Sequence, residues 1–392
     1  MLDIRPLAAT PDAALAAAFD HAPYLRRLSE RCEARPFEDA LAMVTGLADD
    51  TPMDEAMTAL RKAKASAHLA LAADDLSGTR SVMDVTAALT ELATACVQAA
   101  LRVALTSRGL SEKGLFIVAL GKMGAFELNY SSDIDIAAFY ERDGFDGGER
   151  DPGDAAQRVL KDVVRLLDEV TADGYVFRTD LRLRPDPSST PLAVSTEMAE
   201  LYYESVGQNW ERMVWIKARA AAGDMKAAAR FIDRMGSYVW RRNLDYWAID
   251  DIQAIKRMIN TKIGAVGLEN PAPDIKLGPG GIREIEFFVQ TQQLILGGRN
   301  PVLRDNSTLG AMAALRDAGI VTGGTMNRAT QSRQTLMSEL ALRRCVDTRR
   351  LRRLTWICWR HASWFSLPMM PCFNTKMLRK IPAISATLSL QA

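Results

Sequence analysis

The sequence predicts an α+β protein in which one small α/β domain lies between helical regions. Up to about residue 110, apolar residues recur at helical spacing, as in Leu89, Leu92, Ala93 and Cys96. Residues 114–120 then form a continuous apolar run of strand length, and helical spacing returns after residue 195. We expect four regions: a helical region 1–105, an α/β domain 106–205, a helical domain 206–325 and an atypical basic tail 326–392.

The elements expected inside the α/β domain follow the order strand, strand, helix, strand. Ile134 and Ile136 belong to the second strand, and helical spacing runs between residues 153 and 172. The third strand is expected over 175–184, ending at Pro185. The later helices are expected at 196–205, 207–221, 226–243, 249–262 and 282–296, the last one preceded by a Gly/Pro-rich loop, 278–281.

Composition limits the class of protein. Of 392 residues, 48% are hydrophobic and 25% charged, which suits a globular chain that can bury a core. No apolar run reaches the ~18 residues of a membrane span, and residues 1–10 do not resemble a secretory signal. Five cysteines without metal-type spacing argue for a reducing compartment. We therefore expect a cytoplasmic protein without a membrane partner.

The tail differs from the rest of the chain in charge. From residue 328 to the end there are 12 lysines and arginines but only two acids, Glu339 and Asp347. Such a change suggests that the tail is not part of the same folding unit, and we expect residues from about 326 onward not to pack in the core. A frameshifted reading and a true basic tail that binds an acidic partner or nucleic acid are both open, and we prefer the first.

The first candidate site is Ser131-Ser-Asp-Ile-Asp-Ile136. Side chains alternate along a strand, so Asp133 and Asp135 share one face while the isoleucines face inward. Two adjacent carboxylates repel each other unless a cation lies between them, and a small set of oxygen ligands suits Mg²⁺. A solvated strand face is the alternative interpretation.

The segment before these aspartates favours a functional site over a solvated strand face. The buried strand leads into Gly121-Lys-Met-Gly124, a glycine turn of the kind whose backbone N–H groups can approach a phosphate. A strand, a glycine turn and then Asp-hydrophobic-Asp resembles the polymerase-β-like nucleotidyltransferase superfamily. That superfamily usually has Gly-Ser or Gly-Gly at the turn, where this chain has Lys122 or Ala125 in the second position.

The second candidate site is Arg178-Thr-Asp-Leu-Arg-Leu-Arg-Pro185. On a strand, Asp180, Arg182 and Arg184 would share one face. The acid could complete a metal site and the two guanidiniums could hold a phosphate. A surface ladder of ion pairs is the alternative, although this superfamily places its third carboxylate on the strand after Asp-x-Asp.

Longer stretches give a more specific resemblance. Gly121-Lys-Met-Gly-Ala-Phe-Glu-Leu-Asn-Tyr-Ser-Ser-Asp-Ile-Asp135 is similar to the signature of the glutamine synthetase adenylyltransferase/adenylyl-removing family. The stretches 175–185, 207–212 and 276–293 resemble the same family in the same order. Within the last stretch, Glu284 and Glu286 are either site residues or acids that complement a helix dipole.

The resemblance implies a function. Family members carry two nucleotidyltransferase domains, and the single motif near residue 130 suits the N-terminal, adenylyl-removing one, with the C-terminal adenylylating domain absent from a truncated chain. The implied reaction is phosphorolysis of AMP from a tyrosine of glutamine synthetase, giving ADP, with Mg²⁺ held by Asp133, Asp135 and Asp180. The residues implied in phosphate and adenine-nucleotide binding are Gly121, Lys122, Gly124, Ser131, Ser132, Arg182 and Arg184.

Partners and alternatives follow from the same resemblance. Glutamine synthetase is the expected protein substrate, and a PII-type nitrogen-signalling protein is a further expected partner. A non-catalytic truncated fragment that binds one of these proteins is the main alternative. A nucleic-acid-modifying enzyme is disfavoured because the body of the chain is acidic, and no nucleic acid is expected.

Overall fold

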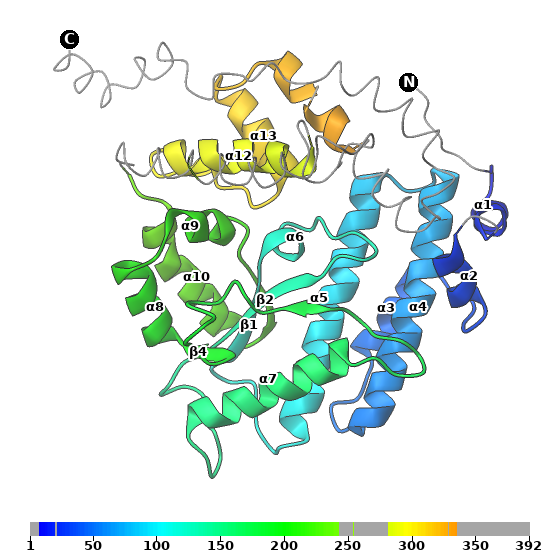
Figure 1. Cartoon of the computed structure of the whole chain (residues 1–392), viewed down its shortest axis with the longest axis horizontal. Helices are drawn as coiled ribbons and strands as arrows, with labels where there is room; N and C mark the ends of the chain where they lie inside the picture. Colours follow the sequence, from blue (N-terminus) through cyan, green and yellow to red (C-terminus); the bar gives the residue numbers. More distant parts are fainter. Residues whose placement is uncertain (1–7, 20–21, 243–253, 255–280, 328, 335–392) are drawn as a thin grey trace.

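The computed structural model describes residues 8–19, 22–242, 254, 281–327 and 329–334 (Figure 1). The helix expected at 249–262, most of the loop at 278–281 and the tail from residue 335 lie outside the described residues. Within them the chain is a mixed α+β protein with one small sheet and many helices, as the sequence predicts.

The N-terminal region is helical, as expected. Its helices are α1 (Pro11–Ala18), α2 (Pro23–Ser29), α3 (Phe37–Thr45), α4 (Met53–Ser77) and α5 (Val82–Thr106). The Ser81 side chain accepts a hydrogen bond from the Asp84 backbone N–H and so caps α5. Gly78, with φ of 74°, ends α4 in the left-handed conformation that glycine adopts without strain.

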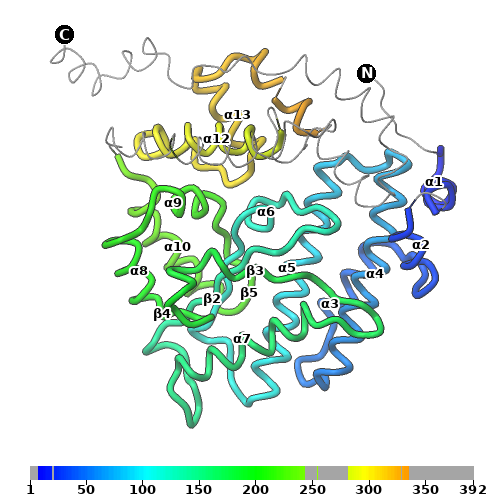
Figure 2. Tube along the Cα trace, viewed as in Figure 1, coloured from blue at the N-terminus to red at the C-terminus, as the bar shows by residue number. Residues whose placement is uncertain are grey.

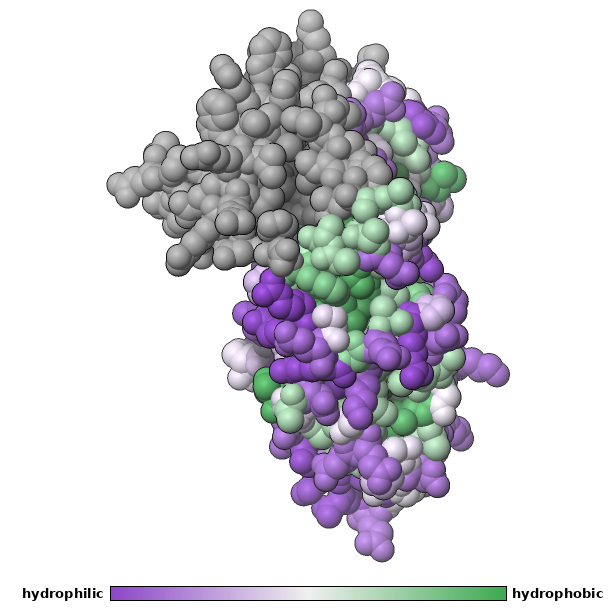
Figure 3. Space-filling view, turned by 90° about the vertical axis from the view of Figure 1, so that its right-hand side faces the viewer, coloured by the Kyte–Doolittle hydropathy of each residue, from purple (hydrophilic) through white to green (hydrophobic). Residues whose placement is uncertain are grey.

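α5 is the central helix of the molecule. It packs against α3, α4, α7 and β5, and 72% of its most apolar window is buried (Figure 1). By length and composition alone it could cross a membrane, although Asp84, Glu91 and Arg102 interrupt its apolar residues. A core helix passes the same test. Seen from the side of α1 and α2, the surface is mainly hydrophilic with patches of apolar side chains (Figure 3).

The sheet is mixed, with strand order β3-β2-β1-β5 and β4 also paired with β2 (Figure 2). β1 (Leu115–Ala119) is antiparallel to β2 (Ile134–Tyr140) and to β5 (Arg219–Gly223). β3 (Thr179–Asp180) and β4 (Ala193–Ser195) run parallel to β2. The remaining elements are α6 (Gly121–Gly124), α7 (Pro152–Asp168), α8 (Thr196–Ser205), α9 (Asn209–Trp215), α10 (Met225–Val239), α12 (Ile282–Leu296), η1 (Pro301–Leu303) and α13 (Thr308–Asp317).

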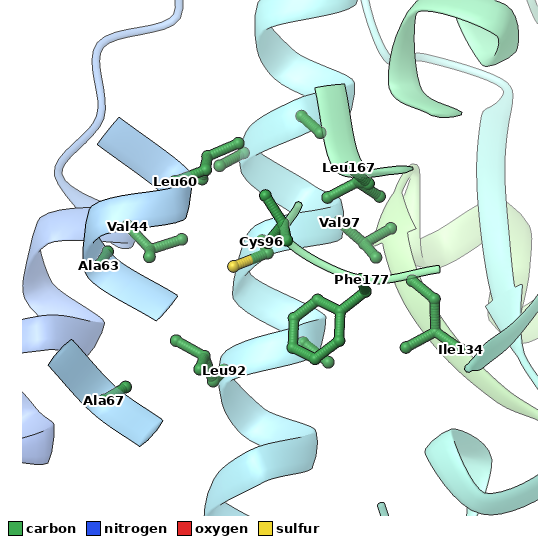
Figure 4. Packing of buried hydrophobic residues seen from close by; sticks show 14 of the residues in the cluster. Val44, Leu60, Ala63, Ala67, Leu92, Cys96, Val97, Ile134, Leu167 and Phe177 are labelled. Carbon is green, nitrogen blue, oxygen red and sulfur yellow. The ribbon is translucent and has the colours of Figure 1, made fainter. Parts of the chain in front are cut away.

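Two hydrophobic cores cover the two faces of the sheet. One joins alternate residues of β1 and β2 to the helices α3, α4, α5 and α7, and Figure 4 shows Ile134 beside Val97, Leu167 and Phe177. The other joins Phe116 and Phe139 to aromatic residues of α8, α9 and α10. Asp135 has the same parity as Phe139, so it lies on the second face, near the end of β2 where the apolar packing stops.

Three expectations need correction. The strand expected over 175–184 is confined to Thr179–Asp180, because its pairing with β2 ends there and the chain turns. The helix expected at 207–221 ends at Trp215, and Arg219–Gly223 pairs with β1 instead. The alanines of residues 219–223 favour a helix, but this segment forms a strand because it pairs with the edge of β1. The sheet thus extends past residue 205, the expected end of its domain.

The third correction concerns the tail. Helical backbone continues through 323–327 and 329–334. Ala329 packs with α12 and α13, and the Arg333 side chain is fully buried. Ala329 and Arg333 therefore pack in the core, contrary to the expectation for residues from about 326 onward. Residues 335–392 lie outside the described residues.

Candidate functional site

The glycine turn lies directly beside the Asp-x-Asp strand. The Leu120 N–H donates to the Asp135 carbonyl at 2.9 Å, which ties the start of α6 to β2. Gly121 has φ of 52°, and a Cβ there would collide with the Asp135 carboxylate. A Cβ at Gly124 would overlap the backbone carbonyl of Lys217. Both glycines are therefore required for close approach, one to an acidic side chain and one to a neighbouring backbone.

The strand register brings the predicted acidic residues to one place. Asp135 pairs with Asp180 in the parallel β2–β3 ladder, so their side chains leave the same face of neighbouring strands. Asp133 precedes Asp135 by two residues, and the Ile134 N–H donates to the Arg178 carbonyl at 2.9 Å. The backbone positions of all three carboxylates thus meet at the end of β2 that adjoins the glycine turn.

The side chains of two of these acids are held by arginines. Arg178 Nε donates to Asp133 Oδ1 at 2.5 Å, and its terminal nitrogen donates to the Ser131 carbonyl at 3.0 Å. Arg182 donates to Asp180 through its backbone N–H at 2.9 Å and through its guanidinium at 2.5–3.1 Å. In the part of the chain that the structure describes, no three His, Cys, Asp or Glu side chains form a ready metal cluster. The structure therefore brings together the backbone positions of Asp133, Asp135 and Asp180, while their side chains do not form a metal cluster.

The Asp180–Arg182 pair predicts a pH dependence. The hydrogen bonds from Arg182 hold the pKa of the Asp180 carboxyl below its ordinary value, against the opposing effect of partial burial. Because the folded-state pKa is depressed, the pair stabilises the fold above pH ~4 and loses this contribution as pH falls through the folded pKa.

We expect Arg182→Gln to raise the pKa of Asp180 toward the ordinary value of about 3.9. The carboxyl carbon of Asp180, followed by NMR through an acid titration, reports this directly. Arg234→Gln, which breaks an exposed pair with Glu200 on α8, is the matched control and should leave Asp180 unchanged. An Asp180 midpoint that is the same in Arg182→Gln and in the wild type contradicts the assignment.

Arg184 does not share the environment of Arg182. Its guanidinium is buried and donates to the carbonyls of Pro191, Leu181, Pro187 and Thr190 at 2.9–3.2 Å. Because the chain turns after Asp180, the strand parity that placed Arg184 beside Asp180 does not hold. In this arrangement Arg184 stabilises the loop 181–191, and the geometric argument for it as a phosphate ligand is wrong.

The remaining predicted residues lie around the turn. The Ser132 hydroxyl accepts from the Asn129 N–H at 3.2 Å, and the Ser132 N–H donates to the Asn129 carbonyl at 3.0 Å. The Ser131 carbonyl accepts a hydrogen bond from Arg178. Lys122 is half-buried, and its carbonyl accepts from the Glu127 N–H at 2.8 Å. The structure thus places Gly121, Lys122, Gly124, Ser131 and Ser132 on one loop that joins β1 to β2.

Sequence reasoning missed several charged residues near this loop. Arg178 has the same parity as Asp180, a signal that was available in the strand pattern. Glu127 and Lys217 are buried, and Lys217 Nζ lies 3.3 Å from Glu127 Oε2 and 3.2 Å from Glu286 Oε1. In the sequence, a single charged residue inside an apolar stretch, as in Val-Trp-Ile-Lys217-Ala, indicates such a buried charge.

Comparison with known proteins identifies the family. A family model described as glutamate-ammonia ligase adenylyltransferase matches residues 7–234, more than half of the chain. The chain belongs to this family. The resemblance predicted from the loop and strand motifs is confirmed, and the family consists of nucleotidyltransferase enzymes.

Individual relatives of the family agree with the family model. The bifunctional glutamine synthetase adenylyltransferase/adenylyl-removing enzyme of Caulobacter vibrioides is 48% identical over 333 residues, which cover 79% of this chain and 34% of the relative. The proteins of the same name from Agrobacterium fabrum and Brucella suis are 43% and 41% identical, over 81% and 86% of this chain. The chain spans about a third of the length of these relatives.

A second family model, described as GlnD PII-uridylyltransferase, matches residues 253–356. This match continues about thirty residues past 326, into the segment expected to be an atypical basic tail.

Proposed function

We propose that the loop 121–132 and the strand ends at Asp133, Asp135 and Asp180 form the active site of a polymerase-β-like nucleotidyltransferase domain. The observation that carries the proposal is the in-register pairing of Asp135 with Asp180 next to a glycine turn that touches the Asp135 carboxylate. A pair of carboxylates beside a glycine turn suits metal-assisted transfer of a nucleotidyl group.

The proposed cofactor is Mg²⁺, and the donor set fits it. Asp133, Asp135 and Asp180 would supply carboxylate oxygens, the ligands that Mg²⁺ prefers. Arg178 and Arg182 form ion pairs with Asp133 and Asp180, and their side chains are 50% and 83% exposed. Such exposed guanidiniums can turn away when a cation takes the carboxylates. Bound there, Mg²⁺ would supply neutralisation of phosphate charge and stabilisation of the leaving oxygen.

The proposed reaction is removal of AMP from an adenylylated tyrosine of glutamine synthetase. An oxygen of inorganic phosphate forms a bond to the AMP phosphorus, the bond from that phosphorus to the tyrosine oxygen breaks, and ADP leaves. The tyrosine oxygen then takes a proton. In this chain, Arg182, released from Asp180, would hold the attacking phosphate, and the glycine turn would orient the phosphates through its backbone.

The proposed biological setting is control of nitrogen assimilation in the cytoplasm. Relatives named for glutamine synthetase adenylylation and adenylyl removal support this enzyme as the protein substrate. The second match, to a model named for PII uridylylation, supports a PII-type protein as a regulatory partner. The proposal assigns adenylyl removal to this region of the family.

The test is the release of ADP from adenylylated glutamine synthetase. We expect release only when phosphate and Mg²⁺ are both present, with unmodified tyrosine recovered by mass spectrometry. Replacing phosphate by sulfate should abolish ADP release. Binding of glutamine synthetase without any ADP release would contradict the proposed activity and favour a non-catalytic binding fragment.

A further inference from the structure

A buried ionic network joins the glycine-turn loop to the C-terminal helices. It contains two acids, Glu127 of the loop and Glu286 of α12, and two bases, Lys217 after α9 and Arg333 in the last described helix. The side chains of Glu127 and Arg333 are fully buried, Lys217 is 6% exposed and Glu286 is 16% exposed. Two acids and two bases balance, so the buried network is neutral overall.

Glu127 is the centre of this network. Its carboxylate receives Lys217 Nζ at 3.3 Å and the Arg333 guanidinium at 2.6 Å. It also accepts from the N–H and hydroxyl of Thr308, the first residue of α13, at 2.8 and 3.0 Å. These partners come from three segments up to 206 positions along the chain from Glu127, and Arg333 contributes an ion pair alone, so the network is a long-range connection.

Glu127 and Lys217 also contact the glycine turn, and so does Asn306, which lies beside the network. The Glu127 N–H donates to the Lys122 carbonyl at 2.8 Å, and Asn306, just before α13, donates to the Gly124 carbonyl at 3.2 Å. The Lys217 carbonyl lies against Gly124, where a Cβ would not fit. α12 and α13 lie as a layer across the end of the sheet where α6 is found (Figures 1 and 2).

The pKa shifts of Glu286 and Lys217 favour the charged form of each side chain. Burial acts to raise the pKa of Glu286, but Lys217, Arg333 and Lys122 outweigh it and lower the pKa to about 2. Burial acts to lower the pKa of Lys217, and the two carboxylates outweigh it and raise the pKa. Lys122 of the turn therefore lies within the electrostatic reach of α12.

We propose that Glu127 and Lys217 are positioning residues, through which α12, α13 and the segment around Arg333 set the conformation of the glycine turn. Buried ion networks are weak sources of stability, but they can fix one arrangement among several because every charge needs its partner. In this interpretation the turn beside Asp135 is held from outside the sheet, by the C-terminal helices. The inference rests on the proposed function only in treating the turn as part of the nucleotide site.

Hydrogen–deuterium exchange of the turn tests the proposal without relying on activity. The double variant Glu127→Gln/Lys217→Met keeps the buried cluster neutral, because Glu286 and Arg333 remain as a pair. We expect amides of residues 121–127 to exchange on the order of tenfold faster in this variant, while amides of β1 and α5 are unchanged. Glu141→Gln/Arg230→Met, which makes the same changes in an exposed pair, is the control.

Asn306→Ala gives a second, milder variant that loses only the bond to the Gly124 carbonyl. It is expected to speed exchange of the turn even if the double variant does not fold. Calorimetric titration with ADP, and with inorganic phosphate alone, should then show weaker binding in the variants whose turn exchanges faster. Turn amides that exchange at the wild-type rate in Asn306→Ala and in a folded double variant would overturn the proposal.

The two proposals fail in distinguishable ways. If the wild-type protein binds neither ADP nor phosphate, the proposed function is wrong, and the exchange rates still decide whether the network positions the turn. If ADP binds and the turn exchanges faster without any loss of affinity, the network does position the turn, but the turn is not part of the nucleotide site, and the role proposed for it in nucleotide binding is overturned.

Discussion

Asp135→Asn is expected to reduce phosphate-dependent ADP release by at least about a hundredfold at saturating Mg²⁺. Asp135 is the acid that pairs with Asp180 across the strands and lies against Gly121. The amide keeps the shape of the side chain but removes one negative charge from a site that must bind a divalent cation. The rate of ADP release and the Mg²⁺ concentration for half-maximal rate are the quantities to measure.

The same change should leave the fold intact. Asp133 and Asp180 are already paired with Arg178 and Arg182, so removing the charge of Asp135 breaks neither pair, and the midpoint of thermal unfolding should stay equal or rise slightly. Asp233→Asn, on the exposed side of α10, is the matched control and should retain wild-type turnover. Wild-type turnover by Asp135→Asn at saturating Mg²⁺ would remove Asp135 from the active site.

Lys217→Met is expected to lower the free energy of unfolding by about 3–5 kcal/mol, the usual effect of removing one partner from a buried ionic pair. The substitution leaves Glu127 and Glu286 with Arg333 as their sole charged partner within the network, although the Glu127 side chain is fully buried. Urea denaturation followed by circular dichroism measures the loss.

The matched comparison for Lys217→Met is the double variant with Glu127→Gln. Replacing both members of a buried pair by neutral groups is often nearly neutral for stability, so the double variant should recover most of the loss. Arg230→Met, which breaks the exposed pair with Glu141, should cost less than ~1 kcal/mol. A Lys217→Met protein that unfolds at the wild-type urea concentration would show that the network contributes nothing to the fold.

The sequence predicts the strands and the turn around Asp133 and Asp135 well because their signals are local. The continuous apolar run of β1 and the alternation around Asp133 and Asp135 each determine a strand within a few residues. Gly121 and Gly124 likewise predict a turn from the local sequence. In the structure, neither position has room for a side chain. These features need no knowledge of distant residues.

The parts that sequence reasoning missed depend on distant contacts. Arg184 was expected beside Asp180 because side chains alternate along a strand, but the pairing with β2 ends at Asp180, so this alternation does not continue to Arg184. β5 has the composition of a helix and becomes a strand because the edge of β1 needs a partner. Arg333 is in a segment whose charge suggests exposure, yet Glu127 lies 206 positions earlier and gives it a buried partner. No local pattern encodes that pairing.

We propose that the strand ends at Asp133, Asp135 and Asp180 hold a divalent cation beside the glycine turn. Anomalous diffraction from crystals grown with Mn²⁺ and ADP tests it most directly. We expect a metal peak with oxygens of Asp135 and of at least one of Asp133 and Asp180 at about 2.0–2.3 Å, and with Arg178 or Arg182 turned away. ADP bound against the turn with no metal on these carboxylates, or a metal bound elsewhere, would contradict it.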